Sequence, residues 1–145
     1  MRTREGQALR ADMEEKLNRL ETLAAQVAQR APLVVHAYQE KLQARLTELL
    51  DTPIDPQRLA TEVAFMADRC AIDEELVRLA SHLRQLREIF TLPDSVGRKL
   101  DFLIQELNRE VNTIGSKGSD LTIAACVVEA KAEIEKLREQ AQNIE

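Results

Sequence analysis

The chain has 145 residues, of which only four are Gly and four are Pro, and no Gly lies between Gly6 and Gly97. This composition argues against a turn-rich β-sandwich, a collagen-like chain or a flexible linker, and 44% hydrophobic with 31% charged residues suits a helical globular or coiled protein. The net charge of −5 means that a polyanionic partner needs a local basic strip or bound metal ions.

Apolar residues and alanines at steps of three and four predict a long amphipathic helix over about 4–50. Pro32 lacks a backbone N–H and disfavours helical geometry at the residue before it, so we expect a kink or short break near Ala31. The stripe begins with Leu9, Met13, Leu17, Leu20, Ala24, Val27 and Ala31.

Three further helical segments are predicted, over 55–90, 95–114 and 119–143. Asp55 followed by Pro56 is a good helix start, and Asp73 could cap a restart inside the second segment. Gly115 suits a helix C-cap, and Ser119 or Asp120 can begin the last helix. No segment has the pattern of a β-strand. The sequence therefore predicts an all-α fold of elongated helical hairpins or a bundle, which forms one domain over 1–145.

The third segment carries a polar stripe beside its apolar one. Projected at about 100° per residue, the apolar stripe holds Leu100, Leu103, Ile104, Leu107, Val111 and Ile114. The polar stripe holds Asp101, Gln105, Asn108 and Asn112, with Arg98 and Arg109 at its edge, whereas Lys99, Glu106 and Glu110 lie farther round. Such carboxamides can bind a polar ligand or hold water near a metal, and the alternative is an interhelical polar network that fixes register.

Glu75 and His82 lie seven residues apart, so they share a helix face at the border of an apolar stripe. A carboxylate and an imidazole so placed could ligate a divalent ion or act as general base and acid. The alternative is a semi-buried histidine with satisfied hydrogen bonds. Glu74 and Arg78 read as an ordinary i,i+4 ion pair.

The loop at 115–118 contains two of the four glycines and directly follows the polar stripe. It resembles an anion-binding loop but lacks the spacing of a Walker motif and a preceding strand. We expect any mobile or ligand-facing element here.

The cellular location of the protein is predicted from the absence of a membrane-spanning segment and of a signal peptide in the sequence. The longest apolar run, 123–128, is far shorter than the ~20 residues of a membrane span. The charged N-terminal residues do not resemble a signal peptide. Cys70 and Cys126 have no zinc-site spacing and fit thiols in a reducing compartment. We expect a cytoplasmic protein without a membrane partner.

Several strings together resemble the bacterial YicC/YloC family: Arg4-Glu-Gly, residues 67–76 followed by Ser81-His82, residues 97–117, and residues 138–145. The resemblance covers nearly the whole chain, and the string over 97–117 is its most specific part. Family members are about twice as long, so the chain is similar to their C-terminal half and lacks their N-terminal domain.

The resemblance implies a cytoplasmic, divalent-metal-dependent endoribonuclease that cleaves single-stranded RNA and forms homo-oligomers, with no DNA expected as substrate. Manganese or magnesium held by carboxylates would neutralise phosphate charge and activate the nucleophile. The positions that match the family's strings are Asp68, Asp73, Glu74, Glu75, His82, Asp101, Gln105, Glu106, Asn108, Arg109, Glu110, Asn112 and Lys117.

Within that set, the helical projection favours Glu75, His82 and Asp101 as metal ligands and catalytic acid/base groups. It favours Asn108 and Asn112 for positioning RNA, and Arg98, Arg109 and Lys117 for binding phosphate. An alternative is a non-catalytic helical module for RNA binding and oligomerisation, whose cleavage activity requires the missing N-terminal domain. A purely structural coiled-coil adaptor is disfavoured by the Asn/Gln stripe and the family strings.

Overall fold

The computed structural model describes residues 2–90 and 97–143, and within these ranges the chain forms five α-helices and no strand. They are α1 (Arg2–Leu49), α2 (Pro56–Cys70), α3 (Asp73–Ile89), α4 (Gly97–Lys117) and α5 (Leu121–Gln142). The predicted all-α fold is confirmed. None of the described helices combines the length and the apolar character that crossing a bilayer requires.

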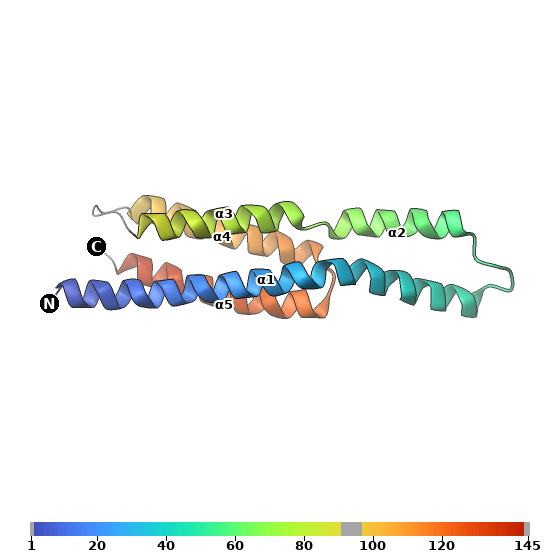
Figure 1. The fold of residues 1–145 in the computed structure, drawn as a ribbon, viewed down its shortest axis with the longest axis horizontal. Coiled ribbons are helices and arrows are strands. Elements are labelled where there is room, and N and C mark those ends of the chain that lie inside the picture. The colour runs from blue at the N-terminus through green and yellow to red at the C-terminus, as the bar shows by residue number, and fades with distance from the viewer. Residues whose placement is uncertain (1, 91–96, 144–145) are drawn as a thin grey trace.

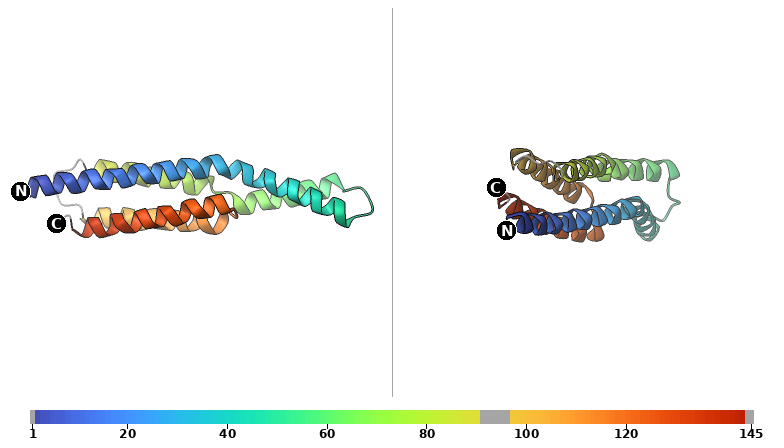
Figure 2. Two further views of the ribbon diagram at one scale, coloured as in Figure 1. Left: turned by 90° about the horizontal axis from the view of Figure 1, so that it is seen from below. Right: turned by 60° about the vertical axis from the view of Figure 1, so that its left-hand side comes forward.

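The first part of α1 forms an elongated four-helix bundle with α3, α4 and α5 (Figure 1). Within it, α1 packs against α3 and α5, and α4 packs against the same two helices. The rest of α1 and α2 form an antiparallel hairpin, residues 35–70, that projects beyond the bundle (Figures 1 and 2). We call this hairpin the arm. α1 begins and α5 ends at the opposite end of the molecule (Figure 1).

The bundle core is aliphatic, as the predicted stripes require. All six residues of the apolar stripe on α4 are at most 2% exposed. On α1, Met13 and Leu17 are completely buried, and Leu9, Ala24 and Ala31 pack against the core from its edge. Burial of each large aliphatic side chain contributes about 1.5–3 kcal/mol to folding, so these stripes hold the helices together.

Most predicted helix starts are confirmed. Asp55 caps α2 by accepting a hydrogen bond from the Gln57 N–H at 3.0 Å, and Pro56 is the first helical residue. The second segment does restart, but the cap is Ile72, and Asp73 is the first residue of α3. Ile72 makes no side-chain capping hydrogen bond, and its side chain is buried in the core at 1% exposure.

Of the two outcomes expected near Ala31, a kink or a short break, the break is absent, because α1 continues through Pro32. The ribbon of α1 changes direction along its length instead (Figure 2), as expected when proline removes one helical hydrogen bond.

Gly115 does not end α4, which continues to Lys117. The turn comes at Gly118, whose N–H donates to the Ile114 carbonyl at 2.9 Å. Asp120 then caps α5 by accepting from the Ile123 N–H at 3.1 Å, as predicted. The segment expected to be a ligand-facing loop is therefore mostly helical. The predicted break after Phe90 lies outside the described residues except at Gly97.

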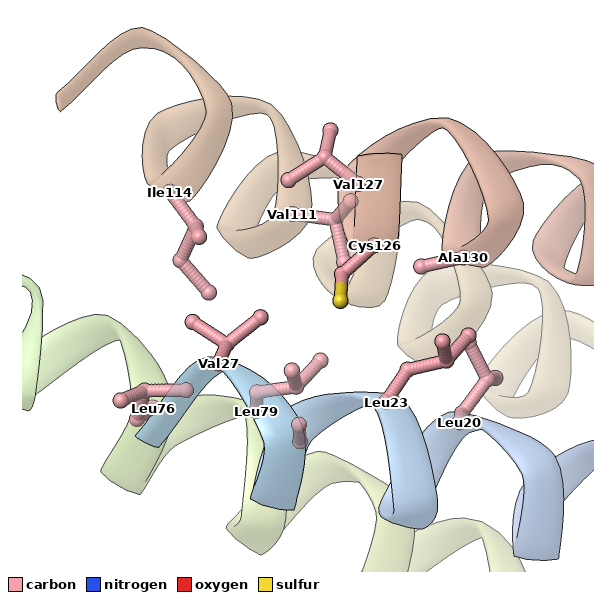
Figure 3. A pocket seen from close by; sticks show the side chains of 11 residues that line it. Leu20, Leu23, Val27, Leu76, Leu79, Val111, Ile114, Cys126, Val127 and Ala130 are labelled. Carbon is pink, nitrogen blue, oxygen red and sulfur yellow. The ribbon is translucent and has the colours of Figure 1, made fainter. Parts of the chain in front are cut away.

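All four bundle helices line a small apolar pocket of about 20 Å³ (Figure 3). Its lining is apolar apart from the Cys126 thiol, whose pKa is raised by burial. A cavity of this size could hold a water only if polar partners were available, so we expect it to be dry.

Candidate functional site

α3 and α4 are antiparallel neighbours (Figure 1). Charged residues of the two helices meet along one edge of their contact. Three contacts define the register: Glu75 with Lys117, Arg78 with Glu110, and His82 with Glu106. As the residue number rises on α3, that of its partner falls on α4. The polar borders of the two helices therefore face each other over about two turns of α3 and about three turns of α4.

His82, Glu106 and Glu110 form the tightest acidic group, which we call the His82 cluster. One ligand atom from each residue lies within 4.8 Å of the others, and no second group of this kind occurs in the described parts of the chain. His82 Nε2 lies 3.9 Å from Glu106 Oε2, which is too long for a hydrogen bond. The three side chains are 17%, 23% and 6% exposed, respectively.

Neither ring nitrogen of His82 has a hydrogen-bond partner, although both are buried. A buried polar atom without a partner costs about 1–3 kcal/mol. The sequence-based alternative of a histidine with satisfied hydrogen bonds therefore does not describe this ring. An imidazole with an unused nitrogen facing two carboxylates is a suitable donor set for a divalent cation.

Arg78 connects the cluster to the rest of the polar edge. Its Nε donates to Glu110 Oε1 at 2.9 Å, and its terminal nitrogens lie 3.5 Å from Glu75 and 3.6 Å from Glu74. The hydrogen bond to Glu110 is the main cause of the raised pKa of Arg78. The ion pair with Glu74 expected from the sequence exists at 3.6 Å. The contact of Arg78 with Glu110 on α4 is shorter and is a hydrogen bond, so it can orient the Glu110 carboxylate.

Glu75 is buried at the end of this edge and accepts a hydrogen bond from Lys117 Nζ at 2.9 Å. Burial alone would raise its pKa, but the bond from Lys117 and the charges of Lys117 and Arg78 outweigh burial and lower it. Its second oxygen, Oε2, has no partner. Glu75 is thus an ionised carboxylate with one oxygen unused.

The charges along this edge do not cancel. Glu74, Glu75, Glu106 and Glu110 are opposed by two fixed cations, Arg78 and Lys117. The edge therefore carries an excess of negative charge, which favours a bound cation. The residues present therefore fit a bound metal ion by donor type, by charge and by the unpartnered His82 nitrogens.

The structure brings together some of the sequence-predicted ligands and separates others. His82 belongs to the cluster. Glu75 is linked to the cluster by Arg78, which contacts both Glu75 and Glu110. Asp101 does not join: it is exposed, and its Oδ2 accepts from Gln105 Nε2 at 3.3 Å. It lies about 140° around α4 from Glu106 and about 180° from Glu110.

A second observation places Asp101 on the α5 side of α4. The pKa of Arg138 on α5 is raised mainly by Glu135 and, as a smaller effect, by the charge of Asp101. The prediction from sequence placed the metal site on the border of α4 that carries Asp101, and it placed Glu106 and Glu110 farther round the helix. Lys117 lies on the same border of α4 as Glu106 and Glu110, and it pairs with Glu75. Its position in the sequence could have indicated that this border of α4, and not the one with Asp101, faces α3.

The residues predicted to contact RNA lie mostly on the outer face of α4. Arg98, Asn108, Arg109 and Asn112 are exposed, and within the described ranges their side chains form no ion pair or hydrogen bond. The carboxamides therefore do not bridge helices here. Lys117, by contrast, is committed to Glu75.

Comparison with known proteins supports the family resemblance. Residues 27–145 match the sequence model of the family described as "Endoribonuclease YicC-like, C-terminal". The chain is 51% identical over 147 aligned positions to a "Probable endoribonuclease YicC" of Clostridioides difficile, and 39% identical over 145 to one of Haemophilus influenzae. In both cases all of this chain is aligned with 50% of the relative, so the chain spans about half their length.

Proposed function

Because the chain belongs to the YicC-like endoribonuclease family, whose C-terminal region it represents, we propose that it supplies the metal-binding site of an enzyme that hydrolyses single-stranded RNA. The observation that carries this proposal is the His82 cluster, in which two carboxylates face an imidazole without hydrogen bonds. Cleavage of RNA phosphodiester bonds needs positive charge at the phosphate, and this acidic chain would obtain it from a cation.

His82, Glu106 and Glu110 are the residues that would hold the ion. A bound divalent ion neutralises phosphate charge and lowers the pKa of a coordinated water. One nitrogen and two carboxylate donors favour manganese over magnesium, which prefers oxygen ligands alone. Arg78 orients Glu110 through its Nε–H, the usual role of a group that hydrogen-bonds a metal ligand.

The exposed side chains of α4 supply contacts for the RNA backbone. Arg98 and Arg109 can each pair with a phosphate, and Asn108 and Asn112 can hydrogen-bond ribose or bases. Single-stranded RNA fits such a surface because its unpaired bases are accessible, whereas a duplex hides them.

Manganese binding separates this cluster from the ligand set predicted from sequence. We expect Glu106→Gln and His82→Ala to weaken Mn²⁺ binding by the chain at least about tenfold. Asp101→Asn should leave it unchanged, as should the control Glu48→Gln on the arm. Titration followed by the electron paramagnetic resonance of free Mn²⁺ measures this without any RNA. Weakening by Asp101→Asn but not by Glu106→Gln would place the ion at the sequence-predicted set instead.

Cleavage is then measured with a single-stranded RNA, the same RNA in a duplex, and single-stranded DNA, each with and without Mn²⁺. The proposal requires metal-dependent cleavage of the first substrate alone. Assays of this chain and of a full-length relative also test the alternative, a non-catalytic RNA-binding and oligomerisation module. Activity confined to the longer protein, with no effect of Glu106→Gln in it, would favour the alternative.

The proposal includes self-association, in which copies of this chain form a homo-oligomer through the arm. The arm exposes Leu49, Leu50 and Phe65, which are 67%, 43% and 59% exposed. Exposed apolar side chains on a projecting hairpin favour contact between copies of the chain.

A further inference from the structure

The outer face of α4 contains one large aromatic side chain among its polar residues. Phe102 is 57% exposed, although the chain has only three Phe, one Tyr and no Trp. Phe90 is buried in the core, and Phe65 lies on the arm. An exposed aromatic ring on a polar helix face costs solvation free energy and contributes nothing to the core.

The neighbours of Phe102 on the helix are of two kinds. Glu106, a member of the His82 cluster, lies one turn farther along α4 at i+4, where Cβ atoms are about 5–6 Å apart. On the other side of the ring, Arg98 and Arg109 lie about 6 Å before it and about 10 Å after it along the helix axis. The ring thus lies between the candidate metal site and two guanidinium groups without ion pairs in the described ranges.

This arrangement has the parts of a single-strand nucleic-acid site. A flat π surface stacks on an unpaired base of any identity, and flanking cations bind the phosphates on either side. An aliphatic residue would provide apolar area but no stacking surface, which distinguishes Phe102 from the other exposed large apolar side chains of the bundle in the described ranges: Leu33, Val77, Leu121 and Val128.

We propose that the ring of Phe102 stacks on an unpaired RNA base whose neighbouring phosphates contact Arg98 and Arg109. This subsite rests on the proposed function and adds a position for the substrate: the stacked nucleotide lies one helical turn from the His82 cluster. It would hold the strand beside the site of cleavage without selecting a base.

The test measures binding of short oligoadenosine RNA to the chain by fluorescence anisotropy, at low ionic strength and in EDTA so that no cleavage occurs. Phe102→Leu should weaken binding about 5- to 100-fold, the usual effect of losing one stacked base. Phe102→Trp should retain it. The matched control is Phe65→Leu, the same change at a Phe that is 59% exposed on the arm, and it should bind as the unaltered chain does.

The Phe102→Trp variant gives a direct readout, because its indole is the sole one in a chain without Trp. Oligoadenosine should quench its fluorescence, and an abasic ribose-phosphate oligomer should not. Equal RNA binding by Phe102→Leu and the unaltered chain, or an unquenched indole, would overturn the stacking subsite while leaving the proposed function intact. No RNA binding by the unaltered chain would overturn both.

Contact between copies of the chain is the competing use of an exposed Phe. A lower mass of Phe102→Leu in sedimentation equilibrium, with RNA binding unchanged, would assign Phe102 to a protein interface and end the proposal.

Discussion

At the scale of single residues, Asp120 shows how one side chain can serve two parts of the fold. Its carboxylate caps α5 at the Ile123 N–H and also receives two hydrogen bonds from Arg30 of α1, both at 3.0 Å. The bonds from Arg30 are the main cause of its lowered pKa, against the opposing effect of burial. The cap that begins α5 therefore also fixes α5 to α1.

The pH dependence of stability follows from that lowered pKa. A carboxyl group whose pKa is lower in the folded state stabilises the fold above its unfolded pKa of about 3.9 and loses this effect as the pH falls through the folded value. Asp120→Asn keeps a capping oxygen but loses the charge. We expect it to lower the free energy of unfolding by about 1 kcal/mol at neutral pH. The difference should vanish in strong acid.

Urea unfolding of both chains across that pH range measures the difference. Asp51→Asn, a change at an exposed residue in the turn of the arm, is the control. A deficit of Asp120→Asn that stays constant down to strong acid would contradict the assignment of the effect to charge.

At the scale of elements, the α4–α5 turn is determined by how closely the two helices approach. Gly118 is buried, and a Cβ atom there would lie 2.7 Å from Ile123 Cγ2 and 2.9 Å from the Ile114 carbonyl oxygen. Glycine is needed because of this packing and not because of a positive φ. The same close approach keeps Lys117 beside Glu75 at the end of the polar edge.

Gly118→Ala should therefore destabilise the fold by about 1–3 kcal/mol, since a backbone carbonyl cannot move aside as a flexible side chain can. Gly6→Ala is the matched control, because a Cβ at Gly6 meets no atom within 4 Å and alanine favours helix there. Thermal unfolding followed by circular dichroism compares the two. A Gly118→Ala variant as stable as the Gly6→Ala variant would contradict the packing argument.

At the scale of the whole molecule, the bundle and the arm have different tasks. Most core residues lie in the bundle, whereas the arm leaves Leu49 and Phe65 exposed. Joint substitution of these two by Ser should change the unfolding free energy by no more than about 0.5 kcal/mol. It should lower the mass of the chain in sedimentation equilibrium if the arm joins copies. A mass that stays the same, above that of a monomer, would place the interface elsewhere.

The sequence by itself determined the helices, most of their caps and the family. Helical periodicity is a local property, so the stripe on α4 and the caps at Asp55 and Asp120 could be predicted from spacing and residue type. Gly115 was misleading as a helix end, because α4 continues through it to Lys117, and α1 continues through Pro32 without the short break that was one of the two expected outcomes.

Only the tertiary structure decided which polar residues meet. An amphipathic helix has two borders beside its apolar stripe, and its own sequence does not say which neighbour each border will face. Packing of α3 on α4 places His82 against Glu106 and Glu110 and leaves Asp101 on the α5 side. It also gives Arg78 its main partner on another helix, Glu110. Periodicity thus predicted which helices carry the polar residues of the candidate site, and the register between α3 and α4 decided which of those residues lie together.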